Sequence, residues 1–68
     1  MKKFYGFNTD NFFIKENLRS YLKENKVYYE LSERGHGWHF EIKCDKNMKE
    51  LIDWRLDIWE RDGEVRGK

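Results

Sequence analysis

Apolar residues follow two different spacings in this chain, and the order of those spacings restricts the folds open to it. Residues 12–25 place apolar side chains at i, i+4, i+7 and i+8, the pattern of one helix face. Apolar and polar residues alternate over 27–32 and again over 38–44, as in strands with one buried face. The glycine-containing segment 33–37 joins these two stretches, so we expect an antiparallel hairpin.

A further strand and a further helix flank these three elements. The aromatic stretch 3–7 is followed by the polar segment 8–11, which is typical of a strand that leads into a helix start. A second apolar set at helical spacing begins at a capping-box pattern and extends over 47–59. An Asp-Gly pair then predicts the end of this second helix and leaves a polar tail over 62–68.

The predicted order is therefore β-α-β-β-α, in a single α+β domain that spans residues 1–68. Because one face of each strand is apolar, we expect both helices on one side of a three-stranded mixed sheet, with the other side open, as in a split βαβ unit. Strand parity predicts the residues of the open face, which are Phe4, Gly6, Asn8, Tyr28, Glu30, Ser32, His39, Glu41 and Lys43. Tyr5 and Phe7 are the alternative for the first strand, but Gly6 is a poor core residue and favours the first set.

Composition excludes several classes of protein. A chain of 68 residues is too short for a Rossmann, TIM-barrel or kinase-sized catalytic unit. Fourteen Lys and Arg against thirteen Asp and Glu give a net charge of +1, with the positive excess in residues 1–26. Cys44 is the only cysteine, which excludes an internal disulfide, and no apolar run is long enough to span a membrane. We therefore expect a cytoplasmic protein of a host cell, without membrane contact.

The hairpin segment carries the most distinctive motif of the chain. Residues 32–39 read S-E-R-G-H-G-W-H, a glycine-rich tip followed by a strand histidine. This segment resembles the S-x-G-x-G-x-H hairpin of the archaeo-eukaryotic primase superfamily, which includes small phage-encoded primase-like proteins with an RRM-like palm. The resemblance implies that His39 contacts the phosphates of a nucleotide.

Two further segments extend the resemblance, and one of them departs from the family pattern. Residues 4–10 are similar to the strand that ends in the metal-binding D-x-D of that family, but Asn8 replaces the first carboxylate. Residues 61–66 are similar to the G-D-D…R segment after the last helix of such phage proteins. Nucleotidyl transfer on paired Mg²⁺ ions needs several carboxylates, and the third acidic position has no counterpart here. The resemblance therefore implies a reduced, catalytically inactive palm.

Structural roles compete with these site assignments. Asp10 is the one candidate metal ligand, but a carboxylate directly before a helix more commonly caps it. His39 could instead pair across the hairpin with Glu30 or Tyr28 on a solvated face. Cys44 continues the inward parity of its strand, so we expect it to be a buried apolar residue. We expect neither a bound metal nor a cofactor.

Charged and aromatic residues predict two alternative binding surfaces. The first would bind nucleic acid or nucleotide phosphates, with bases stacked on the open face and phosphates held by basic groups of the hairpin and the first helix. Its residues are His39, Arg34, Lys15, Arg19, Lys23 and Tyr28. The second would bind a protein through the second helix, whose apolar arc is wider than one sheet face needs. Its residues are Trp54, Ile58, Asp53 and Asp57.

Three functions follow from these surfaces. The favoured one is a small non-catalytic protein, encoded by a phage or mobile element, that binds nucleic acid or nucleotides. The alternative is a phage-encoded inhibitor of a host protein such as a defence nuclease, in the manner of anti-CRISPR proteins, and the same apolar arc could form a homodimer. An active primase-type nucleotidyltransferase fragment is disfavoured, because a required carboxylate is replaced.

Overall fold

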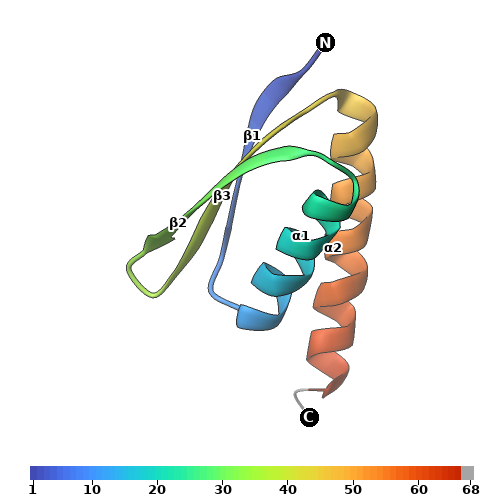
Figure 1. Ribbon diagram of the computed structural model, residues 1–68. Coiled ribbons are helices and arrows are strands. Elements are labelled where there is room, and N and C mark those ends of the chain that lie inside the picture. Colours follow the sequence, from blue (N-terminus) through green and yellow to red (C-terminus); the bar gives the residue numbers. More distant parts are fainter. Residues whose placement is uncertain (67–68) are drawn as a thin grey trace.

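The chain folds into five elements in the order that the sequence predicts, β-α-β-β-α (Figure 1). The computed structural model describes residues 1–66, and the side chains of residues 1–61. The elements are β1 (Lys3–Thr9), α1 (Phe12–Glu24), β2 (Tyr28–Arg34), β3 (Gly37–Cys44) and α2 (Lys46–Arg66). Their types and their order confirm the predicted α+β class.

The three strands form one sheet in the order β1-β3-β2. Strand β3 lies in the middle and pairs with both neighbours in antiparallel register. Strands β1 and β2 therefore run in the same direction, and α1 connects them across the inserted β3, which is the predicted split βαβ arrangement. The prediction of a mixed sheet was wrong, because β3 separates the two parallel strands and leaves only antiparallel ladders.

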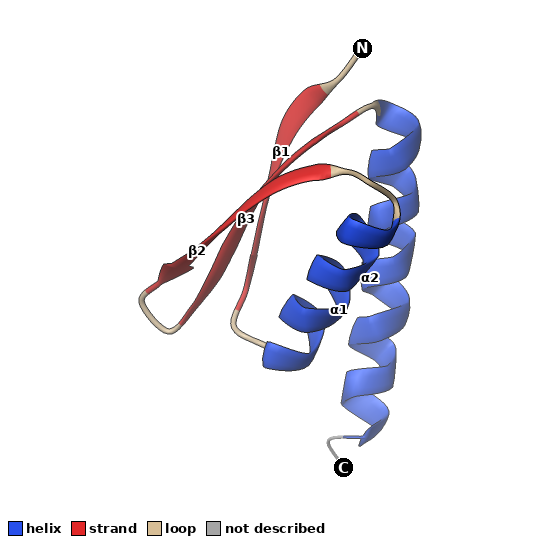
Figure 2. Ribbon diagram, in the orientation of Figure 1, coloured by secondary structure: helices blue, strands red, loops and turns tan. Residues whose placement is uncertain are grey.

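Both helices cover one side of the sheet, and no described element covers the other side (Figure 2). Helix α1 rises beside α2, which descends from the end of β3 and extends past the start of α1 (Figure 1). Between the helices, the rings of Tyr21 and Trp59 pack edge to face with centroids 6.0 Å apart. The predicted layering of two helices on one sheet face is therefore confirmed.

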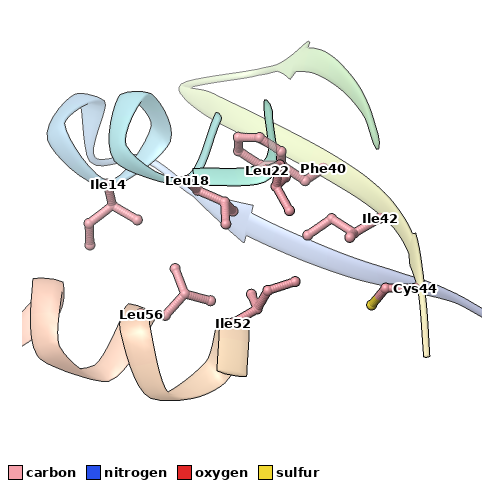
Figure 3. Close-up of a cluster of buried hydrophobic side chains, with 8 residues drawn as sticks. All are labelled: Ile14, Leu18, Leu22, Phe40, Ile42, Cys44, Ile52 and Leu56. Atoms are coloured by element: carbon pink, nitrogen blue, oxygen red, sulfur yellow. The ribbon is translucent and has the colours of Figure 1, made fainter. Parts of the chain in front are cut away.

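The core lies between the helices and the covered face of the sheet (Figure 3). One face of α1 contributes three side chains, β3 contributes three alternate residues, and α2 contributes two residues one turn apart. These eight are Ile14, Leu18, Leu22, Phe40, Ile42, Cys44, Ile52 and Leu56. Because β3 is the central strand, its inward residues are among the most buried, and the expected burial of Cys44 is confirmed.

Each helix begins at a cap close to the residue that the sequence favours. In α1, Asn11 Oδ1 accepts a hydrogen bond of 3.2 Å from the backbone N–H three residues on, so the prediction that Asp10 caps this helix was wrong. In α2, Asp45 Oδ1 accepts a bond of 2.8 Å in the same way, in place of the predicted capping box. Asn and Asp are equally good caps, so adjacent candidates cannot be ranked by type alone.

Helix α2 continues further than the sequence predicts. An end at Asp62-Gly63 and a polar tail were expected, but the helix extends to Arg66, and the last two residues of the predicted tail lie outside the described part. A glycine inside a helix costs about 1 kcal/mol relative to alanine. No proline follows to remove a backbone donor, so this cost does not end the helix.

The β2–β3 hairpin reverses through two residues, Gly35 and His36. Gly35 has a φ of +55°, and His36 has no positive φ, a pattern that fits a type II′ turn. Gly37 opens β3 close to the end of β1, where an added Cβ would lie 2.6 Å from the carbonyl oxygen of Thr9. Glycine is therefore required at position 37 for β1 and β3 to approach at this end.

Candidate functional site

The open face of the sheet carries three rows of side chains, each with one residue from every strand. The register gives an aromatic row of Phe4, Lys43 and Tyr28, an acidic row of Gly6, Glu41 and Glu30, and a histidine row of Asn8, His39 and Ser32. Tyr5 and Phe7 point the other way and pack against the core. The predicted composition of the open face is therefore confirmed, including the choice of the set that contains Gly6.

The aromatic row holds two large rings that remain exposed. Phe4 and Tyr28 are each 55% exposed, and their ring centroids lie 6.4 Å apart at an interplanar angle of 81°. Lys43 lies between them on the central strand, with its Nζ 5.7 Å from the centroid of Phe4. Together with Lys2, the three residues line an open hollow of about 380 Å³. Exposed rings beside ammonium groups suit a ligand with a flat aromatic part and a negative charge.

A second hollow of about 160 Å³ adjoins the first and shares Lys2 and Lys43 with it. Lys26 also lines it, so three lysines line this space, which we call the lysine hollow. None of the ion pairs among the described side chains involves these three lysines. The carboxylate of Asp45 also lines the hollow, and its Oδ1 is used to cap α2. The lysine hollow is therefore positively charged and suited to an anion.

Lys26 occupies an unusual backbone position. It follows the last turn of α1 with a φ of +55°, the left-handed region that favours glycine. The N–H of Lys26 donates to the carbonyl of Lys23, and the N–H of Val27 donates to the carbonyl of Leu22, as in a Schellman motif. A residue other than glycine costs roughly 1–2 kcal/mol in this conformation. The fold thus carries a strained lysine where glycine would be more stable, and strain of this kind gathers at functional sites.

The acidic row separates the aromatic row from the hairpin end of the sheet. Glu30 and Glu41 are cross-strand neighbours on β2 and β3, an arrangement of like charges that is unfavourable. The hydroxyl of Tyr28 donates a 2.7 Å hydrogen bond to Glu30, and this bond to a carboxylate raises the pKa of Tyr28 above its ordinary value of 10. A neutral hydroxyl does not cancel the carboxylate charge, so this row remains negative.

His39 lies on the open face, as predicted, but its ring is already bonded to neighbours. Its Nδ1 lies 2.5 Å from Oδ1 of Asn8, and its Nε2 lies 2.7 Å from Oε1 of Glu41. The predicted partners, Glu30 and Tyr28, bond to each other instead. The side chain is only 17% exposed. A phosphate at His39 would have to displace a carboxylate, so the hydrogen bonds do not favour the phosphate role that the primase resemblance implies.

Helix α1, which carries these basic residues, lies on the covered side of the sheet (Figure 2), whereas His39 and Tyr28 belong to rows of the open face. Lys15 and Arg19 both bind Glu16, at 2.7 and 2.9 Å, and these bonds lower the pKa of Glu16 from 4.5 to about 2. The ammonium of Lys15 also lies over the rings of Phe12 and Trp38, and its side chain is only 14% exposed. The predicted nucleic-acid residues therefore do not form one continuous surface. Lys23, also predicted, lies in the last turn of α1.

Arg34 lies at the hairpin end, far along the strands from the aromatic row. It lines a shallow hollow of about 310 Å³ together with Asp10, His36 and residues at the end of β1 and the start of β3. Asp10, the candidate metal ligand, is exposed there. Among the described residues, no group of three or more His, Cys, Asp or Glu side chains is arranged to hold a metal ion.

The residues predicted for protein binding lie on α2. Trp54 is 58% exposed, and Ile58 is half-buried. The two predicted acidic residues bind cations of the same helix, with Asp53 at 2.6 Å from Lys49 and Asp57 at 2.9 Å from Arg61. Both predicted acidic residues are thus paired with cations of their own helix. Leu51, which the sequence analysis did not single out, is also exposed on α2.

Comparison with known proteins gives no relative on which to base a function. No family model, no curated protein and no solved structure matches this chain. Within residues 1–66, none of the helices has the length and apolar content needed to cross a bilayer. The function has to be inferred from the open face and its charges.

Proposed function

We propose that the protein binds nucleotides or single-stranded nucleic acid through the aromatic row, without catalysing a reaction. The observation that carries the proposal is the position of Phe4 and Tyr28, two exposed rings on either side of Lys43 in one row of an uncovered sheet. Bases stack on such rings regardless of sequence, because every base has a π-face. The adjoining lysine hollow supplies ammonium groups for the phosphate.

The proposal moves the binding surface predicted from the sequence to another part of the molecule. Of the residues named there, Tyr28 remains central, whereas His39 is engaged by Asn8 and Glu41. Lys15 and Arg19 are engaged by Glu16 on the covered side. Charges that already have close partners gain less from a phosphate than unpaired ones, so the lysine hollow is the better anion site.

The experiment is a fluorescence anisotropy titration of labelled octathymidylate at low ionic strength. Phe4→Ala should weaken binding by about 5- to 150-fold, the effect of losing about 1–3 kcal/mol of stacking. Phe12→Ala is the matched control, because Phe12 is also an exposed ring but contacts Trp38 and Lys15 away from the aromatic row. No binding by the wild-type protein, or equal losses in both variants, would overturn the proposal.

A second candidate function is protein binding through α2, which the exposed side chains of Trp54 and Leu51 favour. The predicted homodimer would use the same helix face. Size-exclusion chromatography with light scattering tests the homodimer, and Trp54→Ala should convert a dimer to a monomer. A wild-type monomer at high concentration would reject self-association through this face.

A further inference from the structure

The aromatic row is the only row of exposed large rings on the described part of the open face. Two residues further along each strand, the neighbouring positions are Gly6, Glu41 and Glu30, none of which offers a ring. The row beyond contains the His39 ring, but this ring is bonded to Asn8 and Glu41 and is mostly covered. A nucleic-acid strand that followed the sheet would therefore find one stacking platform and no second one.

The charges along the sheet also change sign after the aromatic row. On one side lie Lys2 and Lys26, which line the lysine hollow together with Lys43 of the row itself. None of the described carboxylates forms an ion pair with these three lysines. On the other side lie Glu30 and Glu41, which face each other across β2 and β3. A phosphate over the lysine hollow is attracted, whereas a phosphate over the acidic row is repelled. A phosphate bound next to the aromatic row is therefore favoured at the end of the sheet that carries the lysine hollow, and disfavoured further along the strands.

We infer that the site takes a single nucleotide unit, with its base on the Phe4–Tyr28 row and its terminal phosphate in the lysine hollow, and that the acidic row prevents a strand from continuing along the sheet. This inference rests on the proposed function and adds the ligand class, a nucleoside monophosphate or the phosphorylated end of a strand. Both ligands present the same chemistry, one flat base next to one phosphate. The strained Lys26 lies in the hollow that receives this phosphate.

The test is a length series measured by isothermal titration calorimetry. The probes are thymidine, its 5′- and 3′-monophosphates, phosphorylated dithymidylate and phosphorylated octathymidylate, together with the unphosphorylated octamer. One of the monophosphates should bind within about threefold of the phosphorylated octamer, because added nucleotides gain no contacts. Thymidine has no phosphate, and the unphosphorylated octamer has only singly charged phosphodiesters inside the strand and no terminal phosphate. Both should therefore bind at least about tenfold more weakly. Equal binding of the monophosphate and the phosphorylated octamer identifies both sources as ligands. Binding of the phosphorylated octamer alone would show that further nucleotides gain contacts, and it would overturn the inference.

Removing the acidic barrier gives an independent test. Glu30→Gln keeps an acceptor for Tyr28 and removes one charge of the acidic row, and Glu41→Gln removes the other. In the double variant, affinity should increase with strand length, whereas in the wild type it should stay flat. Glu50→Gln is the matched control, since Glu50 is an exposed carboxylate on α2. Should the double variant unfold, Glu30→Gln alone should give a smaller increase in the same direction.

The failures of the two proposals are distinguishable. If none of the probes binds the wild-type protein, the proposed function itself is rejected. If the octamer binds but affinity increases with every added nucleotide in the wild type, the single-nucleotide inference is rejected and the proposed function stands. The same conclusion follows if the acidic-row variants leave the length dependence unchanged.

Discussion

The imidazole of His39 lies against Gly6 of the neighbouring strand, where an added Cβ would be 3.3 Å from Cε1 of the ring. The ring is fixed in this position by Asn8 on one side and Glu41 on the other. Glycine in the middle of a strand is otherwise unfavourable, because it packs nothing and loses much conformational freedom on folding. The contact with the imidazole explains why glycine, and not a residue with a side chain, occupies position 6 of the strand.

A double-mutant cycle tests this contact. Gly6→Val should lower the free energy of unfolding by about 1 kcal/mol, because the valine displaces the ring and breaks a hydrogen bond, even though valine favours strands. In a His39→Ala background the same substitution should be neutral or stabilising, since nothing remains to displace. Urea denaturation followed by circular dichroism measures both values. Equal costs in the two backgrounds would show that the contact has no energetic effect.

We predict that Lys26 lowers the stability of the fold and strengthens the binding of a nucleotide. Lys26→Gly should raise the free energy of unfolding by about 1 kcal/mol, because glycine adopts the left-handed conformation without strain. The same variant should bind a nucleotide more weakly, because the lysine hollow loses one of its three charges. Thermal unfolding and calorimetric titration measure the two effects. Lys23→Ala is the control, and it should change the affinity by less than about twofold, because Lys23 does not line the hollow. If Lys23→Ala weakened binding more than Lys26→Gly does, the phosphate would lie on α1 instead.

The hydroxyl of Tyr28 should titrate above its ordinary value because of its bond to Glu30. Since the folded pKa lies above the unfolded one, the bond stabilises the fold fully below pH 10 and the stabilisation is lost as pH rises through the folded pKa. Carbon NMR shifts of the Tyr28 ring measure this pKa directly. Glu30→Gln should return the pKa toward 10, and a pKa that does not respond to this substitution would mean that the hydrogen bond is not formed in solution.

The core should be sensitive to single truncations, because a domain of this size has little stability to lose. Leu18 has no exposed surface, and Leu18→Ala should cost about 2–5 kcal/mol, enough to populate the unfolded state at room temperature. Leu51→Ala removes the same atoms from a half-exposed position on α2, so its effect should stay within about 0.5 kcal/mol. Comparable losses in the two variants would indicate that α2 packs differently from the structure in Figure 3.

Much of the fold could be predicted from local patterns. The two spacings of apolar residues identified four of the five elements and the covered face of the sheet, because each spacing reflects one geometry. Strand β1 was identified from its aromatic residues and the polar segment that follows them. The purely antiparallel pairing could not be predicted, since it depends on which strand lies in the middle, a long-range outcome that local patterns do not contain. The helix end beyond Gly63 was missed because glycine weakens a helix without terminating it.

The candidate site was predicted in part. Strand parity placed Phe4, Lys43 and Tyr28 on the open face, but their alignment in one row required the register of both ladders. The sequence places Lys26 with the basic residues of the first helix and Lys2 near them, as candidates to contact phosphate. The hollow that they line with Lys43 could not be predicted, because Lys2 and Lys26 come from opposite flanks of the sheet and meet only in the folded chain. The left-handed conformation of Lys26 leaves no signal in the sequence, where a glycine at that position would have done so.

A nucleotide titration followed by nitrogen–proton correlation NMR tests the central claim most directly, because it reports every backbone amide at once. Thymidine monophosphate should shift the amides of the aromatic row and of the lysine hollow, that is Lys2, Phe4, Lys26, Tyr28 and Lys43. Shifts confined to Arg19 and Lys23 on α1, or to Arg34 and His39 near the hairpin, would contradict the account, as would spectra that do not change at saturating ligand.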